Sequence, residues 1–167
     1  MTRRLFLVAL PALLVAGCGF KLRRVESLAF GSLYIDAPAG SAVAQRVRSS
    51  LERGGQVRLV ATAAEAEAVL RVGQEVRSKV ILSLSGAGRV TEYRLGLQLS
   101  YSVSGREGRA LADPETIELQ RDLTYDDAQV LAKGAEEQLL YRDMEDSAAL
   151  RILRRLQRIA PAADGES

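Results

Sequence analysis

Two alternating segments in the middle of the chain constrain its fold more than any other feature. Between residues 70 and 84, most apolar side chains fall on even positions, and the alternation resumes on odd positions from residue 93 to residue 103. The glycine-rich turn Gly86-Ala87-Gly88 separates them. This pattern predicts a β-hairpin with one buried and one wet face. The expected buried face consists of Leu70, Val72, Val76, Val80, Leu82, Leu84, Tyr93, Leu95, Leu97, Leu99, Tyr101 and Val103.

Two helical segments can cover the apolar face of this hairpin, which cannot stay exposed. Ser41 is a good N-cap for a helix of about three turns that ends at Gly54-Gly55. A longer helix is predicted from about residue 135 to residue 159, with acidic residues early and arginines late, as the helix dipole favours. The expected buried stripe of this helix is Leu140, Met144, Ala148, Ile152, Leu156 and Ile159.

Further short strands complete the predicted fold. Residues 33–36, 57–60 and 117–123 have strand-like patterns, and a turn at Gly105 to Gly108 leads through Asp113-Pro114 to the last of them. We therefore expect an α+β fold, a two-layer sandwich in which one mixed four- to five-stranded β-sheet carries two α-helices packed on one face.

The N-terminus has the organisation of a bacterial lipoprotein signal peptide. Arg3 and Arg4 precede an apolar stretch from residue 5 to residue 15, and the small residues Ala16 and Gly17 precede Cys18. We expect cleavage before Cys18 and acylation of this cysteine. An ordinary signal peptide with a chance cysteine is the alternative reading. A membrane-spanning anchor is disfavoured, because the apolar run is short and contains a proline.

This reading divides the chain into four parts. Residues 1–17 are the signal peptide, 18–30 an acylated tether, 31–160 a single α+β domain, and 161–167 a disordered tail. The chain has 23 basic and 21 acidic residues. Because Arg3 and Arg4 leave with the signal peptide, the mature chain has 21 of each, which argues against a generic nucleic-acid binder.

The composition and the short motifs argue against an enzyme. The chain has no histidine and its one cysteine is Cys18, so the usual ligands of zinc, haem and iron–sulfur clusters are missing, as are Ser-His and Cys-His pairs. Ser78 and Lys79 would point to opposite faces of a strand. Asp126-Asp127 is read as a turn or helix start. We expect no catalytic residue, no metal and no cofactor apart from the acyl groups on Cys18.

Several segments together resemble the LPS-assembly lipoprotein family LptE (RlpB). The first is Cys18-Gly19-Phe20-Lys21-Leu22-Arg23, and the second is Thr91-Glu92-Tyr93-Arg94-Leu95 before a long alternating strand. The third is Arg121-Asp122-Leu123-Thr124-Tyr125-Asp126-Asp127, followed by Leu131-Ala132-Lys133 and Glu136-Glu137. Each motif is short, but their order is collinear from the lipidation site to about Ile159.

The resemblance implies an outer-membrane lipoprotein that partners and plugs the LPS-export β-barrel LptD, and that assists barrel assembly and lipopolysaccharide delivery to the outer leaflet. It also implies lipopolysaccharide binding near the hairpin tip and at the Leu-Ala-Lys element. Lys133 matches the basic residue of the Leu-Ala-Lys element. The basic residue of the hairpin tip would fall on or near Gly86, and Arg89 is the closest basic side chain.

Two further observations bear on this reading. Gly19 is not the aspartate that retains many lipoproteins in the inner membrane, which favours the outer membrane. The alternative function is a periplasm-facing lipoprotein scaffold or carrier that binds another lipid or envelope protein. A lipid carrier would need an enclosed apolar cavity, for which closely alternating strands leave little room.

Overall fold

The computed structural model describes residues 28–159 of the chain. The predictions for the signal peptide, Cys18, most of the tether and the C-terminal tail lie outside these residues. The strands are β1 (Ser32–Asp36), β2 (Arg58–Leu59), β3 (Ala68–Val72), β4 (Val76–Leu84), β5 (Val90–Gly105) and β6 (Ala110–Thr124). The helices are α1 (Ala42–Gly54) and α2 (Val130–Gln157), with short 3₁₀ turns at Ala63–Glu65, Arg106–Gly108 and Asp127–Gln129.

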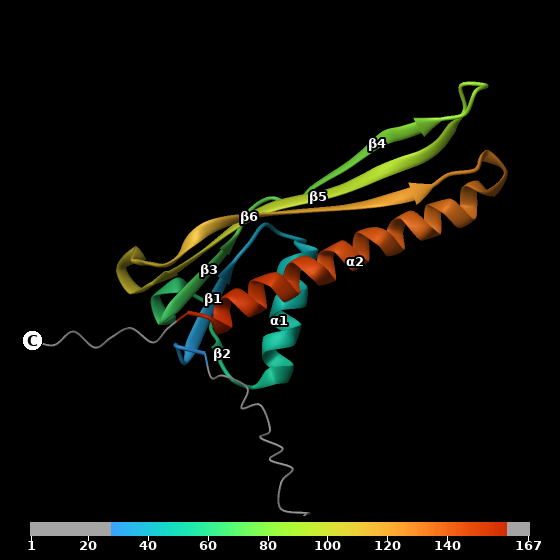
Figure 1. The fold of residues 1–167 in the computed structure, drawn as a ribbon. Coiled ribbons are helices and arrows are strands. Elements are labelled where there is room, and N and C mark those ends of the chain that lie inside the picture. Colours follow the sequence, from blue (N-terminus) through green and yellow to red (C-terminus); the bar gives the residue numbers. More distant parts are fainter. Residues whose placement is uncertain (1–27, 160–167) are drawn as a thin grey trace, which may run out of the picture.

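One mixed sheet carries both helices on one face, which confirms the predicted fold class (Figure 1). β1 pairs in parallel with β2 and β3, whereas β5 pairs antiparallel with β3, β4 and β6. The sheet has six strands instead of four or five, because the alternating segment 70–84 forms two strands, β3 and β4. Both of these strands pair with β5 on the side opposite β6.

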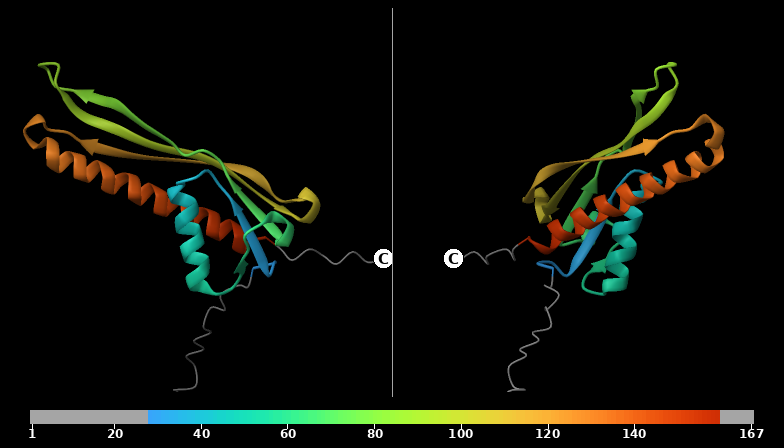
Figure 2. Two further views of the ribbon diagram at one scale, coloured as in Figure 1. Left: turned by 180° about the vertical axis from the view of Figure 1, so that it is seen from behind. Right: turned by 45° about the vertical axis from the view of Figure 1, so that its right-hand side comes forward.

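The sheet is consequently wide at one end and narrow at the other. We call the wide end, where β1, β2 and β3 join β5 and β6 and where α1 crosses α2, the base. We call the narrow end, formed by β4, β5 and β6 above the first half of α2, the arm. The arm projects well beyond the base (Figures 1 and 2).

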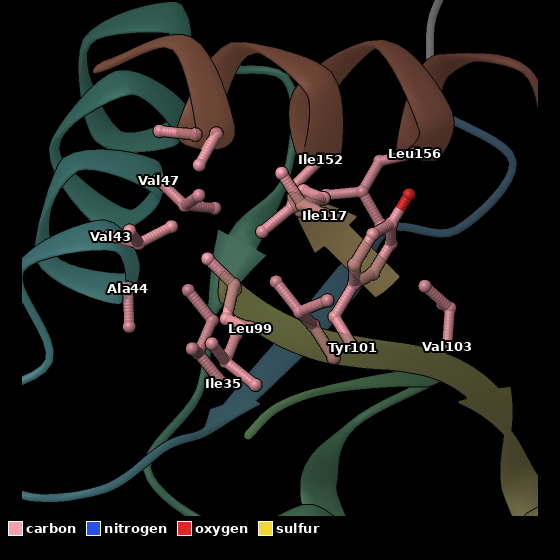
Figure 3. Packing of buried hydrophobic residues seen from close by; sticks show 14 of the residues in the cluster. Ile35, Val43, Ala44, Val47, Leu99, Tyr101, Val103, Ile117, Ile152 and Leu156 are labelled. Carbon is pink, nitrogen blue, oxygen red and sulfur yellow. The ribbon is translucent and has the colours of Figure 1, made fainter. Parts of the chain in front are cut away.

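The core fills the space between the sheet and the two helices. Val43 and Val47 of α1 and Ile152 and Leu156 of α2 converge on the inner face of the sheet, where Leu99 lies (Figure 3). The predicted stripe of α2 is buried from Met144 to Ile159, while Leu140 is only partly buried. The helix begins at Val130, earlier than the expected residue 135.

The helix termini of α1 follow the sequence signals. The Ser41 side chain accepts a hydrogen bond from the Ala44 N–H at 3.0 Å, which caps the helix as predicted. Gly55 ends the helix in the left-handed conformation, with φ of 61°, that glycine adopts without steric cost. The Ser41 hydroxyl in turn donates to Glu75 at 2.5 Å and so ties the helix start to the connection between β3 and β4.

The parity prediction for residues 70–84 is wrong beyond Val72. In β3, Val72 lies opposite Tyr101, but in β4, Val76 lies opposite Gln98, so the register changes by one residue between the strands. A one-residue change moves every later side chain to the other face of a sheet. Val76 and Val80 therefore lie on the outer face, away from α2, whereas Leu70 and Val72 are buried as predicted.

The predicted turn at Gly105 to Gly108 is confirmed by the 3₁₀ turn Arg106–Gly108, but Asp113-Pro114, expected before the last strand, is already part of β6. The pairing with β5 shifts by one residue between Ala112 and Glu115, so Asp113-Pro114 sits at a bulge in a continuous strand. Proline is tolerated there because β6 is an edge strand, and a bulge releases one hydrogen-bond donor from the ladder.

Candidate functional site

The predicted binding residues lie at the far end of the arm. Arg89 is exposed and closes the turn between β4 and β5, where its N–H donates to the Ser85 hydroxyl at 3.1 Å. Gly88 has φ of 75° in this turn, which explains the glycine there. The turn extends beyond the start of α2 (Figure 1). As predicted, residues 86–88 form a hairpin tip.

Lys133 lies in the first turns of α2, at the same end of the arm. Its Nζ is 2.9 Å from Glu136 Oε2, and only 17% of its side chain is exposed. An ammonium group has three N–H donors, so this ion pair leaves donors for a second anion. No hydrogen bond or ion pair joins Lys133 to Arg89 within residues 28–159. The two cations therefore share an end of the molecule without forming one tight cluster.

A second lysine of the arm, Lys79, was not considered as a binding residue from the sequence. Its Nζ is 2.6 Å from Glu137 Oε2 and 4.3 Å from the centre of the Tyr93 ring. Tyr125 stands edge-on to Tyr93, with ring centres 5.1 Å apart. The hydrogen bond to Glu137 raises the pKa of Lys79 above its usual value, although partial burial opposes the shift.

The neighbouring residues Glu136 and Glu137 thus each form an ion pair with one lysine. Lys133 comes from the same helix, whereas Lys79 comes from β4 because the register change turned it toward α2. The only sequence signal for Lys79 was its position two residues after Arg77 on a strand. The face on which Lys79 lies could not be assigned without the register change between β3 and β4.

A buried carboxylate fixes the arm to the base. Glu145 of α2 has a side chain that is 3% exposed, and it pairs with Arg46 of α1 at 2.6 Å and with Arg77 of β4. The Arg77 guanidinium also lies 5.0 Å above the centre of the Tyr141 ring, and the Tyr141 hydroxyl donates to the Ser78 carbonyl at 2.7 Å. These contacts hold β4 against α2 over the middle of the molecule.

The outer face of β5 and β6 is polar, and several of its side chains are paired across the two strands. Arg94 and Asp122 make two hydrogen bonds across β5 and β6, at 2.8 and 3.0 Å, and Gln98 donates to Glu118. The guanidinium lowers the pKa of Asp122 below its usual value. A surface whose polar groups are paired in this way is better suited to contact another polar protein surface than to bind a charged ligand.

The grooves of residues 28–159 and a search of these residues for metal clusters and membrane spans give no second candidate site. A groove of about 540 Å³ between α1 and α2 is open and is lined partly by Arg46, Arg53 and Asp146, which suits an acyl chain poorly. In these residues we find no cluster of three or more side chains that could hold a metal ion. Here no helix combines the length and the apolarity needed to cross a membrane.

Comparison with known proteins decides the family. The family model described as "LptE: Lipopolysaccharide-assembly" matches residues 27–156. The chain belongs to the LptE family. The resemblance expected from the sequence motifs is thereby confirmed, and the matched residues include the whole arm. The comparison with curated protein sequences gives no match.

Solved lipoprotein structures share the LptE fold of this chain. Lipoprotein B of Nitrosomonas europaea is 38% identical with a TM-score of 0.73, over 83% of this chain and 90% of that one. Rare lipoprotein B of Shewanella oneidensis is 30% identical with a TM-score of 0.65, over 75% and 92%. A minor lipoprotein of Acinetobacter baumannii is 27% identical with a TM-score of 0.63, over 78% and 92%.

Proposed function

We propose that this protein is a non-enzymatic outer-membrane lipoprotein that partners and plugs the LPS-export β-barrel LptD, and so assists lipopolysaccharide delivery to the outer leaflet. The match of residues 27–156 to a lipopolysaccharide-assembly family carries the proposal. In this proposal Cys18 bears the acyl chains that hold the protein at the membrane. Two or more acyl chains are enough for stable anchoring.

The shape and surface of the arm support the role of a plug. An elongated body fits a tubular lumen better than a sphere does, and the lumen of such barrels is polar. The outer face of β5 and β6 is polar, and the Arg94–Asp122 pair cancels charge within it. A plug of this kind can meet a polar wall without burying unpaired charge.

The far end of the arm is the proposed lipopolysaccharide contact. Lys133 and Arg89 would bind phosphate groups, for which ammonium and guanidinium groups are the preferred partners. Lys133 can do so without losing Glu136, because part of its donor capacity is unused. Arg89 is free to reorient on an exposed turn.

The test is affinity purification of the acylated protein from outer membranes, followed by identification of the co-purifying proteins. We expect a large β-barrel protein in stoichiometric amount. A Cys18→Ala variant, which cannot be acylated, is the control for membrane anchoring. Recovery of the acylated protein with periplasmic proteins and without any large barrel would instead support the scaffold or carrier function.

A further inference from the structure

Two lysines lie on the side of the arm where α2 runs along the strands (Figures 1 and 2). Lys133 and Glu137 are four residues apart on α2 and are both half-buried, so they share the stripe of the helix that faces the sheet. Lys79 reaches Glu137 from β4, with its Nζ 2.6 Å from Glu137 Oε2. The two lysines therefore meet the same face of α2 about one helical turn apart.

Each of these lysines keeps hydrogen-bond donors that its carboxylate does not use. An ammonium group has three N–H donors, and within residues 28–159 each Nζ has one hydrogen-bond partner. The Lys79 side chain is 36% exposed, so a ligand can reach its remaining donors from solvent. Arg77, on the same face of β4, is instead bound to the buried carboxylate of Glu145.

The surroundings of Lys79 hold its ammonium group in place. The centre of the Tyr93 ring is 4.3 Å from Lys79 Nζ and that of the Tyr125 ring is 6.0 Å away, so both lie within cation–π range. Glu137 fixes the same atom from the helix. Because the side chain is already ordered, an anion that binds to it costs less conformational entropy than one bound by a free surface lysine.

We propose that Lys79 binds a phosphate group of lipopolysaccharide together with Lys133, and that Glu137 opposes this binding. The inference rests on the proposed lipopolysaccharide contact and adds to it a residue of the sheet. A phosphate group has three acceptor oxygens, so it can accept charge-assisted hydrogen bonds from both ammonium groups. It would then lie near the Glu137 carboxylate, whose like charge repels it. Glu137 thus positions Lys79 and limits its affinity for the anion.

The alternative role of Lys79 is structural, because its ion pair with Glu137 joins β4 to α2. The two roles differ in what they predict for the two partners of the pair. If the pair only holds β4 against α2, loss of either charge should change lipopolysaccharide binding in the same direction. If Lys79 contacts the ligand, loss of the lysine should weaken binding and loss of the glutamate charge should strengthen it.

The first test is a titration of lipopolysaccharide into the full acylated chain in detergent micelles. Lys79→Gln should raise the dissociation constant about tenfold, as for the loss of one charge-assisted hydrogen bond. Lys79→Arg should retain binding. Glu137→Gln should lower the dissociation constant about threefold, because its amide oxygen still accepts from Lys79 but its charge is gone. A gain of affinity cannot arise from loss of the fold, so this variant remains decisive even if Lys79→Gln is destabilised.

Arg94→Gln is the matched control for Lys79→Gln. Arg94 also lies on the arm, pairs with a carboxylate, and is 38% exposed against 36% for Lys79. It lies opposite Val80, however, and so points to the outer face of the sheet. The variant removes the same unit of charge, and its dissociation constant should stay near the wild-type value.

The second test uses lipopolysaccharide from which the phosphate groups have been removed. The wild type and Lys79→Gln should bind this ligand equally, because the group that Lys79 contacts is missing. A difference between them as large as that with the intact ligand would show that Lys79 does not act through phosphate.

Three further results would overturn the role of Lys79. One is unchanged affinity in Lys79→Gln, and another is an equal loss in Arg94→Gln. The third is a Glu137→Gln variant that binds as weakly as Lys79→Gln, since the pair would then act only by holding β4 to α2. A wild type that binds no lipopolysaccharide would instead remove the proposed lipopolysaccharide contact, and this inference with it.

Discussion

At the scale of single residues, Glu145 shows how one side chain joins three elements. It lies on α2, is almost fully buried, and pairs with arginines of α1 and β4. Burying a carboxylate costs free energy unless its oxygens are paired, and here each oxygen has a guanidinium partner. Nothing in the sequence distinguishes Glu145 from the other acidic residues in the first half of the helix.

Glu145→Gln tests this role. The neutral amide leaves Arg46 and Arg77 without their common counter-charge, so we expect the free energy of unfolding to fall by about 2 kcal/mol. This loss is smaller than that expected for breaking a fully buried ion pair, because both arginines are partly exposed to water. Urea unfolding followed by circular dichroism measures the change.

Asp146→Asn is the matched control. Asp146 is adjacent in sequence and also pairs with Arg46, at 3.3 Å, but its side chain is 67% exposed. Exposed pairs contribute about 0–1 kcal/mol. Equal destabilisation by the two variants would show that burial of Glu145 is not what makes its contacts matter.

At the scale of elements, the break between β3 and β4 has the largest effect on the molecule. The Gly73 N–H donates to the Ser100 carbonyl at 2.7 Å, so the chain stays bound to β5 while the register changes. The change turns Lys79 and Arg77 toward α2 and places Val76 and Val80 outside. Without it the apolar positions of residues 76–84 would face the helix, as the alternation predicted.

Gly73→Ala tests this break. A Cβ at residue 73 would lie 2.7 Å from Ser100 Oγ and 3.1 Å from the Ser100 carbonyl oxygen, so the Ser100 side chain would have to rotate and the β5 backbone to shift slightly. We expect a loss of about 1–3 kcal/mol in the free energy of unfolding, as for other overpacked sites, measured by urea unfolding.

The control for Gly73→Ala is Gly54→Ala at the end of α1. A Cβ there has no neighbour within 4 Å, and alanine favours a helix by about 1 kcal/mol over glycine. We expect this variant to be as stable as the wild type or slightly more stable. If Gly73→Ala behaves in the same way, close approach to Ser100 is not the reason for the glycine.

At the scale of the whole molecule, the two ends differ in role. The base holds most of the core and the crossing of the two helices, while the arm carries Lys133 and Arg89 at its far end. A charge reversal at each end therefore distinguishes a specific contact between Lys133 and lipopolysaccharide from an effect of net charge alone. Lys133→Glu should weaken lipopolysaccharide binding about tenfold or more without unfolding the domain, as measured by binding titration and thermal melting.

Arg106→Glu is the matched control, because Arg106 is exposed in the 3₁₀ turn between β5 and β6 at the opposite end of the sheet. It makes the same change in net charge, and binding should remain near the wild-type level. Lys133→Arg should also retain binding. Unchanged affinity in Lys133→Glu, or an equal loss in Arg106→Glu, would remove Lys133 from the proposed site.

The sequence by itself determined the local structure and the family. Periodicity and capping residues gave α1, most of α2 and the long hairpin, because these depend on neighbours a few residues apart. The motifs around Glu92-Tyr93 and Leu131-Ala132-Lys133 indicated the LptE family, which the family model confirms.

Only the tertiary structure decided which side of β4 faces the helix. Side chains keep their alternation between the two faces only while the register is unchanged, and a one-residue change of register reverses it. The register was set by contacts far apart in the sequence, between Gly73 and Ser100 and between Glu145 and its two arginines. For the same reason Lys79 reaches Glu137, and the apolar side chains of β4 form an open edge instead of the core that the alternation predicted.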